Sequence, residues 1–594
     1  MQNINLNYNV TQFERLFIDK GLELLFKNSI DSYRLRLHNP KTLIEELISV
    51  CQSSLTGFLT NNDYAASTAK ELSNALEEDH HGISFLKVSK KHYKDILAKT
   101  GSSNYSLLIQ SSKLILRDNL DYIDQVFNSL INEIASFAEL HDDGSPRFQN
   151  ELAASEKKIV VLTNHFFVGL ISKGYNKHYL GKFFQITFIY NKTAGLDFGD
   201  RLDILKTLIN RPVEEFTVIF NVIGSAFQFN ELNRIDSRYG LVSRQFRAIL
   251  SNQVSDKVND FLEENKQEFL IYIKVDAQDY YKAIEIAREK ISMDIDIYHL
   301  GYNKNPTTIG DKCAVIGASD PTKSSTFPSN FQIDGYVRSG ADVFDILLHK
   351  IQKINENGID RDSQDKIISA IRYYRTGSES LELETKLLNY WIGLEYIFTF
   401  KNPALKTIES IRTSFPICHS LIYVKRNLWD FHKTIKRLGI AHQIADYDDN
   451  LIYLTHHATY QQIIANSPNE LLKFRAAYFQ KWVENPANID VALRRHSTNI
   501  NWNLTRLYRL RNEIVHNAAI KDGIYVHISH LKYYLTFILN SILDFMADAG
   551  VDANNDGQVS IEDYFIAQDI MLGSLKGTSI REYIKVENPS QILY

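Results

Sequence analysis

Apolar residues recur at helical spacing over both ends of the chain. In residues 1–154, the stretches IDSYRLRLHNPKTLIEELISVCQSSL and NLDYIDQVFNSLINEIASF place them three or four positions apart, which is the spacing of one buried face of an α-helix. The same spacing returns from residue 341 onward, for example in ADVFDILLHKIQKINE and HLKYYLTFILNSILDFMADAG. We therefore predict a helical region over residues 1–154 and a helical bundle over residues 341–549.

Between residues 155 and 340 the pattern changes to short runs of β-branched and aromatic residues. Such runs are typical of strands, and those found here are KIVVLT, FFQITFIY, EFTVIFNVI, EFLIYIKV and DIDIYHLG. An amphipathic helix, DAQDYYKAIEIAREKI, lies between the last two. This order predicts an α/β or α+β domain, and without GxGxxG or GxxxxGK[ST] a nucleotide-binding loop is not expected there. The fold class predicted for the whole chain is α+β, mostly α.

Composition and charge limit what such a fold binds. The net charge is −5, so binding of nucleic acid requires a local basic patch. The three cysteines are far apart and lack CxxC spacing, which disfavours both a disulfide framework and a cysteine zinc site. The start lacks the pattern of a signal peptide, and no apolar run approaches the ~20 residues that span a bilayer. We therefore expect a cytoplasmic protein with no membrane partner.

The stretch RNEIVH, residues 511–516, lies in a strongly patterned helical segment. At about 100° per residue, the apolar stripe of this helix contains Leu507, Leu510 and Ile514. Asn512 and His516 share a face roughly opposite the stripe, with Arg509 beside them. Arg511 lies about 140° from His516 on such a helix, so a straight helix does not bring the two side chains together. A bend, a long reach by the arginine or a second helix is needed to complete a site.

The Arg-Asn-x-x-x-His motif resembles that of the HEPN superfamily, in particular its Apea-like members from bacterial defence. The helix LLNYWIGLEYIF, residues 387–398, supplies the W-x-x-L-E element that precedes the motif in that family. The resemblance covers about residues 360–546. It implies a metal-independent ribonuclease in which Arg511 and His516 are the catalytic pair, Asn512 is the polar residue after the arginine, and Glu395 is a supporting carboxylate. It also implies a homodimer or larger assembly, and an anti-phage abortive-infection role in which residues 1–340 respond to a phage-derived trigger.

The residue types suit the cleavage of RNA by its own 2′-hydroxyl. Histidine transfers protons near neutral pH, and arginine offers a planar fork to phosphate oxygens. Between residues 486 and 516 there are five arginines against two acidic residues. We expect RNA contacts from Arg494, Arg495, Arg506 and Tyr508, with Arg509 supporting the catalytic pair. The alternative for the arginines is a solvated helix face. For Tyr508 and Trp502, which could stack on bases, it is core packing, and we favour packing for Trp502.

The segment DANNDGQVSIED, residues 552–563, has the spacing of an EF-hand calcium loop. The ligands predicted by that spacing are Asp552, Asn554, Asp556, Gln558, Ser560 and Asp563. Gly557 occupies the position of the tight turn. The last ligand is Asp instead of Glu, which makes bidentate ligation harder and leaves Mg²⁺ as well as Ca²⁺ open. The alternative is an Asx-turn loop that binds no metal. Residues 550–594 thus form a fourth segment, an EF-hand-like loop with a C-terminal helix.

A second function stays open for the helical part. A catalytically silent HEPN bundle would bind RNA, a nucleotide or a protein and use the loop as a structural calcium site. Exposed side chains of Arg511 and His516 that converge in a cleft favour the enzyme, whereas a buried His516 inside one bundle favours the binding module.

Overall fold

The computed structural model describes most of the chain. The described ranges are 6–26, 38–59, 63–78, 81–139, 145–190, 195–223, 239–251, 253–266, 269–301, 308–329, 341–380, 382–399, 406–517, 524–548, 551–552, 555 and 557–587. The fold is mostly helical with one small antiparallel sheet, which confirms the predicted class. None of the described helices is long and apolar enough to cross a membrane.

The N-terminal region is a bundle of helices. Its α-helices are α1 (Gln12–Leu24), α2 (Pro40–Leu55), α3 (Asp63–Glu78), α4 (Lys90–Leu97), α5 (Tyr105–Asp118), α6 (Tyr122–Ala135), α7 (Pro146–Ser172), α8 (Lys177–Phe188) and α9 (Phe198–Asn210). Their apolar stripes meet in one continuous core. Local signals fix the helix starts: Thr11, Asn39 and Asp197 each form a capping box at an N-terminus, which satisfies backbone N–H groups that lack partners inside the helix.

Three predicted strands are wrong. KIVVLT lies inside α7, most of FFQITFIY lies in α8, and DIDIYHLG belongs to a longer helix. The reason for α7 and α8 is burial on several sides. Ile159, Leu162 and Phe166 of α7, and Phe184 and Phe188 of α8, are all essentially inaccessible to solvent. A helix that is enclosed on several sides is apolar around most of its circumference, and over a short run that pattern cannot be told from a buried strand.

The sheet occupies residues 214–328. Its strands are β1 (Glu214–Ile223), β2 (Tyr239–Leu241), β3 (Phe269–Ala277), β4 (Thr308–Gly317) and β5 (Ser325–Pro328), in the order β2-β3-β1-β4-β5 with every neighbouring pair antiparallel. Helix α13 (Tyr280–Gly301) covers one face, and α11 (Arg244–Ser251) with α12 (Asp256–Glu264) covers the other. The predictions for β1, β3 and the start of α13 are confirmed.

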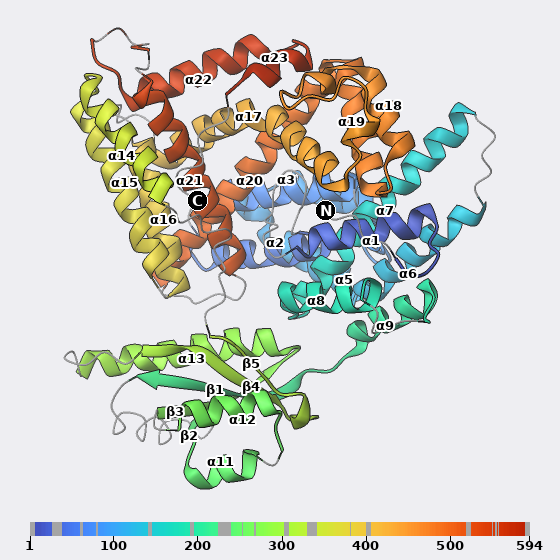
Figure 1. Ribbon diagram of the computed structural model, residues 1–594, viewed down its shortest axis with the longest axis vertical. Coiled ribbons are helices and arrows are strands. Elements are labelled where there is room, and N and C mark those ends of the chain that lie inside the picture. The colour runs from blue at the N-terminus through green and yellow to red at the C-terminus, as the bar shows by residue number, and fades with distance from the viewer. Residues whose placement is uncertain are drawn as a thin grey trace.

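The C-terminal part is helical. It contains α14 (Ala341–Glu356), α15 (Arg361–Glu379), α16 (Leu383–Phe398), α17 (Thr407–Leu438), α18 (His457–Asn466), α19 (Glu470–Glu484), α20 (Ala487–Asn517), α21 (Ile524–Ala547), α22 (Ile561–Leu575) and α23 (Ile580–Lys585). One core joins α16, α20 and α21, and a second joins α17, α18, α19 and α23. Figure 1 shows α3 beside α20 and α1 beside α19, with the sheet set apart from the helices at one end.

Candidate functional site

Helix α20 carries the RNEIVH motif and separates two environments. Leu504, Leu507 and Leu510 are buried in the core with α16 and α21, so the predicted apolar stripe is confirmed. The opposite face does not meet solvent as a free helix face would. It is covered by α2 and α3 of the N-terminal region, and the side chains of the motif therefore divide between the two sides.

Arg511 faces the C-terminal bundle. Its Nη2 lies 3.7 Å from Oε2 of Glu395 on α16, and both side chains are 26% exposed. Its Nη1 donates a hydrogen bond of 3.0 Å to Oδ1 of Asn512. The structure thus brings together three of the residues singled out from the sequence. A carboxylate on one side and an amide oxygen on the other fix the guanidinium while part of it stays open to solvent, an arrangement suited to an anionic ligand.

Asn512 faces the N-terminal region instead. Its Nδ2 donates to the hydroxyl of Tyr64 on α3 over 3.0 Å. Tyr64 is buried, and burial raises the pKa of its hydroxyl to about 12, so the hydroxyl stays protonated at physiological pH. His516 lies one turn further along the same helix. Its backbone is helical, but its side chain lies outside the described residues.

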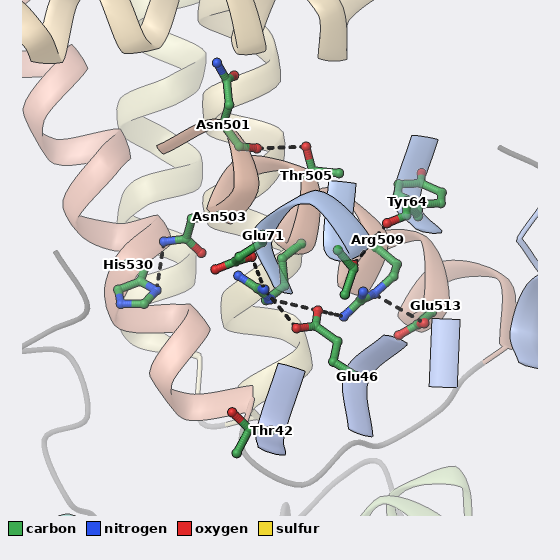
Figure 2. Close-up of polar contacts among 12 residues, drawn as sticks. Thr42, Glu46, Tyr64, Glu71, Asn501, Asn503, Thr505, Arg509, Glu513 and His530 are labelled. Carbon is green, nitrogen blue, oxygen red and sulfur yellow. Dashed lines mark hydrogen bonds and ion pairs between the residues drawn. The ribbon is translucent and has the colours of Figure 1, made fainter. Parts of the chain in front are cut away.

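Arg506 is not exposed, although an RNA contact and a solvated helix face would both expose its side chain. Its Nε and Nη2 donate to the two carboxylate oxygens of Glu46 on α2, each over 2.8 Å, and Nη2 also donates to Glu71 on α3 over 2.7 Å. Only 4% of the Arg506 side chain is exposed. Arg509 is enclosed in the same cluster, 2.6 Å from Glu46 and 3.8 Å from Glu513. Figure 2 shows Glu46 pointing toward Arg509 across this boundary, with Glu71 on the other side of the cluster.

The charges in the cluster reinforce one another. Burial raises the pKa of Glu46, but the charges of Arg506 and Arg509 outweigh burial and hold that pKa well below its usual range. Burial lowers the pKa of Arg506, and the carboxylates of Glu46 and Glu71 more than reverse that effect. Glu46 and Arg506 are therefore both ionised at neutral pH.

Tyr508 is partly buried. Its ring lies between Trp391 of α16 and Tyr64 of α3, with ring centroids 5.6 and 6.3 Å away, an environment closer to core packing than to a free stacking surface. Trp502 is buried, which agrees with the packing alternative. Arg494 and Arg495 are exposed, and Arg495 forms an ion pair with Glu78 of α3.

A groove of about 390 Å³ lies next to Glu395, between α15 and α16. Its charged lining consists of Asp362, Asp365 and Glu395 against Lys366. Lys366 pairs with Asp362 over 2.7 Å. Because the lining is acidic, this groove repels a phosphate backbone, and it is not the cleft in which RNA would be expected.

The EF-hand-like loop is described only in part. The backbone N–H of Gly557 donates to Oδ2 of Asp552 over 2.7 Å, and Asn555 and Gly557 have φ of 59° and 87°. Gln558 is exposed. Among the residues that the structure describes, no three His, Cys, Asp or Glu side chains gather as a metal site, and the predicted ligands Asn554 and Asp556 lie outside them.

The last two predicted ligands cap the helix that follows the loop. Ser560 is the N-cap of α22, and the backbone N–H and hydroxyl of Ser560 both donate to Oδ2 of Asp563, over 2.8 and 2.7 Å. The Asp563 side chain is fully buried. One residue earlier, Val559 forms a single parallel β-bridge with Ile359 in the α14–α15 connection, so the loop is tied to a second helix–loop–helix.

The partners of the arginines were missed by sequence reasoning. Glu46 follows Leu43 by three residues and precedes Val50 by four, so it shares the buried face of α2 with them. A carboxylate on an apolar face indicates a buried ion pair, but the sequence around Glu46 does not show which cation is its partner. A second buried hydrogen-bond network was also missed, because its members lie far apart in the sequence. In it, His419 is hydrogen-bonded to His496 over 2.8 Å and to Tyr533 over 2.7 Å.

Comparisons with family models, with curated proteins and with solved structures find no match to this chain.

Proposed function

We propose that the chain is a metal-independent HEPN-type endoribonuclease, an anti-phage abortive-infection effector regulated by its N-terminal region. The observation that carries the proposal is the environment of Arg511. This arginine is held between Glu395 and Asn512, stays partly exposed, and lies five residues before His516 at the end of α20. The fixed guanidinium and the nearby histidine supply the cation and the proton carrier that RNA cleavage needs.

The reaction uses a group that the substrate carries. The 2′-oxygen of one nucleotide attacks the adjacent phosphorus, and the bond from phosphorus to the 5′-oxygen of the next nucleotide breaks. His516 takes the proton of the 2′-hydroxyl, and the leaving 5′-oxygen receives a proton from water or from a second histidine. Arg511 binds the phosphate oxygens as negative charge develops on them. The products are a 2′,3′-cyclic phosphate and a free 5′-hydroxyl.

A homodimer solves the angular problem of the motif. Arg511 turns toward α16, about 140° from the direction of His516 on an ideal helix. Two copies that pair near the ends of their α20 helices place the arginine of one copy beside the histidine of the other. Two histidines then serve one phosphate, one as base and one as acid.

The test is cleavage of a mixed RNA pool in EDTA. The purified wild type should produce 2′,3′-cyclic phosphate ends, and His516→Ala and Arg511→Gln should each lose at least about a hundredfold in rate, the usual contribution of such groups. Arg375→Gln is the matched control, because Arg375 is an exposed arginine on α15 paired with Glu379. Equal cleavage by wild type and His516→Ala, or cleavage that needs added metal, contradicts the proposal.

A calcium site is a second proposed property, favoured by the loop geometry. The ligand spacing of residues 552–563 carries this proposal, with a glycine at the sixth position for the sharp turn. The backbone N–H of that glycine donates to the carboxylate at the first position, which closes the turn. Calcium should raise the melting temperature of the wild type relative to EDTA, and Asp552→Asn should remove that rise. Asp548→Asn, an acidic position just before the loop, is the control, and an equal response of both variants rejects the site.

A further inference from the structure

The contact between the N-terminal helices and the C-terminal part combines apolar packing, such as that of Leu471 and Phe474 of α19, with a series of ion pairs of one polarity. The pairs are Glu23 with Arg475, Glu46 with Arg506 and Arg509, Asp63 with Arg412, Glu71 with Arg506, and Glu78 with Arg495. In each of them the carboxylate comes from the N-terminal helices and the guanidinium from the C-terminal part. An acidic surface thus lies against a row of arginines, which is the electrostatic pattern of a polyanion on its receptor.

Helix α3 runs antiparallel along α20. Tyr64, Glu71 and Glu78 follow one another at seven-residue intervals, so they line one face of α3. Their partners occur in reverse order on α20: Asn512 first, then Arg506, then Arg495. Negative or acceptor groups of α3 therefore contact α20 at three positions between Arg495 and Asn512.

The arginines lie on one face that leads to the motif histidine. On an ideal helix Arg506 is within about 20° and Arg509 within about 40° of the direction of Arg495, and position 516 is within about 60°. From residue 495 to residue 516 this face is roughly 30 Å long. Arg511 lies on the other side of the helix, toward Glu395. On an ideal helix the covered face thus runs toward position 516.

The contact geometry is one that a phosphate reproduces. Arg506 uses Nε and Nη2 as a fork on the two oxygens of Glu46, and the same fork binds two oxygens of a phosphate. Replacing carboxylate by phosphate on these arginines keeps the charge balance, so an RNA backbone that displaces α2 and α3 leaves no arginine buried without a counter-ion. An apolar contact would offer no such exchange.

We propose that the face of α20 bearing Arg495, Arg506 and Arg509 is the RNA-binding surface of this protein, and that the carboxylates of α2 and α3 occupy it as an internal mimic of the RNA backbone. The inference rests on the proposed function, because it takes RNA as the ligand of the site. It also names the regulation of that site: the chain binds RNA along α20 when α2 and α3 move away.

The test measures RNA binding in the full-length chain with His516→Ala, so that the probe is not consumed. The probe is a fluorescein-labelled single-stranded RNA of mixed sequence, followed by fluorescence anisotropy. Glu46→Gln with Glu71→Gln should tighten binding by about tenfold or more, since two arginines become available to the backbone, and should steepen the dependence of log K on log salt by about 0.7 per phosphate gained. Glu45→Gln is the matched control: Glu45 is the neighbouring residue on α2 and pairs with Lys41 of the same helix.

An exposed pair gives a variant whose folding is not in question. Glu78 and Arg495 are 43% and 60% exposed, so Glu78→Gln keeps the fold and should tighten binding in the same direction by a few-fold. Its control is Glu77→Gln, the adjacent residue on α3, which pairs with Lys94 inside the N-terminal region. If Glu46→Gln/Glu71→Gln and Glu78→Gln bind RNA no better than Glu45→Gln and Glu77→Gln, the proposal is overturned.

A further pair of substitutions separates this surface from a general loosening of the chain. Adding Arg506→Gln and Arg509→Gln to the Glu46/Glu71 variant should abolish the gain in affinity. A gain that survives places the RNA elsewhere and overturns the proposal. Failure of the proposed nuclease gives a different result. If the gain in RNA affinity needs the arginines but the chain with His516 intact cleaves no RNA, the RNA-binding surface is supported and the nuclease activity is rejected. If RNA cleavage needs His516 but the carboxylate variants leave RNA affinity unchanged, the nuclease activity is supported and the RNA-binding surface is rejected.

Discussion

Removing the Arg506 guanidinium should loosen α3 from α20 far more than removing the guanidinium of Arg495. Arg506 and Glu71 are 4% and 3% exposed, so Arg506→Ala leaves a buried carboxylate without its cation. The loss of one partner from a buried pair costs about 3–5 kcal/mol. Arg495 and Glu78 are largely exposed, and an ion pair of that kind contributes at most about 1 kcal/mol. The structure therefore predicts a clear difference between two arginines of one helix.

Amide hydrogen exchange is the suitable assay, because a chain with several cores does not unfold in one two-state step, whereas exchange reports the opening of each segment. A loss of 3–5 kcal/mol lowers the protection of the α3 amides by about 10² to 10³-fold or more, since each 1.4 kcal/mol is a factor of ten. Arg495→Ala should lower it by less than about tenfold. Equal, small effects of the two substitutions would refute the buried network and with it the docking of α3 on α20.

Replacing both partners tests the cause of that loss. Arg506→Met with Glu71→Met removes the charge and the unpaired carboxylate together, and apolar side chains of similar volume often replace a buried ion pair at little cost. The double variant should therefore protect α3 better than Arg506→Ala does. If the double variant is worse, the contact depends on the charges themselves and not on avoiding an unpaired one.

The docking also depends on pH through Glu46. The pKa of Glu46 is lower in the folded chain than in the unfolded chain, so its stabilising contribution is present above its ordinary pKa and is lost as pH falls through the lowered value. In a His527→Gln variant, protection of α3 should accordingly hold from neutral pH to about pH 4.5. In the wild type it should decline earlier, because burial lowers the pKa of His527 to about 3 beside Glu46, Arg506 and Arg509, and such a group loses stability as pH falls below about 6.5. A decline that begins at pH 6 in the variant would assign the effect to another histidine instead.

Three other predictions concern regions away from this interface. Burial raises the thiol pKa of Cys51, Cys313 and Cys418 to about 12, so iodoacetamide should label none of them at pH 8 until the chain is unfolded. Burial lowers the pKa of His496 to about 3, below the value of about 6.5 expected in the unfolded chain, so acidification from pH 7 to pH 5 should cost about 2 kcal/mol through this group. Amide hydrogen exchange in α20 should show that loss, and His496→Gln should reduce it. Gly557 has φ of 87°, so Gly557→Ala should strain the loop by about 1 kcal/mol and reduce the calcium-dependent rise in melting temperature.

Local periodicity explains which elements were predictable. The strands β1 and β3 alternate between the two faces of the sheet, and α13 is amphipathic with Ile284, Ala287 and Ile291 buried, so each shows its period in its own sequence. The segment of α7 around Phe166 does not, because it is enclosed by α1 and α6. A helix in that position needs no polar face, and its sequence loses the period by which a helix is recognised.

The chemical character of the arginines on α20 could be predicted from the sequence, but whether they are exposed to solvent could not. The sequence shows that Arg506 and Arg509 are cations on one face of a helix, and a charged helix face is usually exposed to solvent. Whether this face is exposed depends on Glu46 and Glu71, which lie more than 400 positions earlier in the chain. Contacts of that sequence separation are set by how domains pack, and no spacing rule within one helix contains them.

The neighbouring motif residues Arg511 and Asn512 contact different parts of the molecule. Successive side chains on a helix point about 100° apart, and here Arg511 turns to Glu395 inside the C-terminal bundle while Asn512 turns to Tyr64 of the N-terminal region. A displacement of α2 and α3 therefore frees Asn512 and uncovers Arg509 without breaking the pair that orients Arg511. The N-terminal helices are placed to change one half of the candidate site while the bundle keeps the other half fixed, which is the arrangement that regulation by docking and release requires.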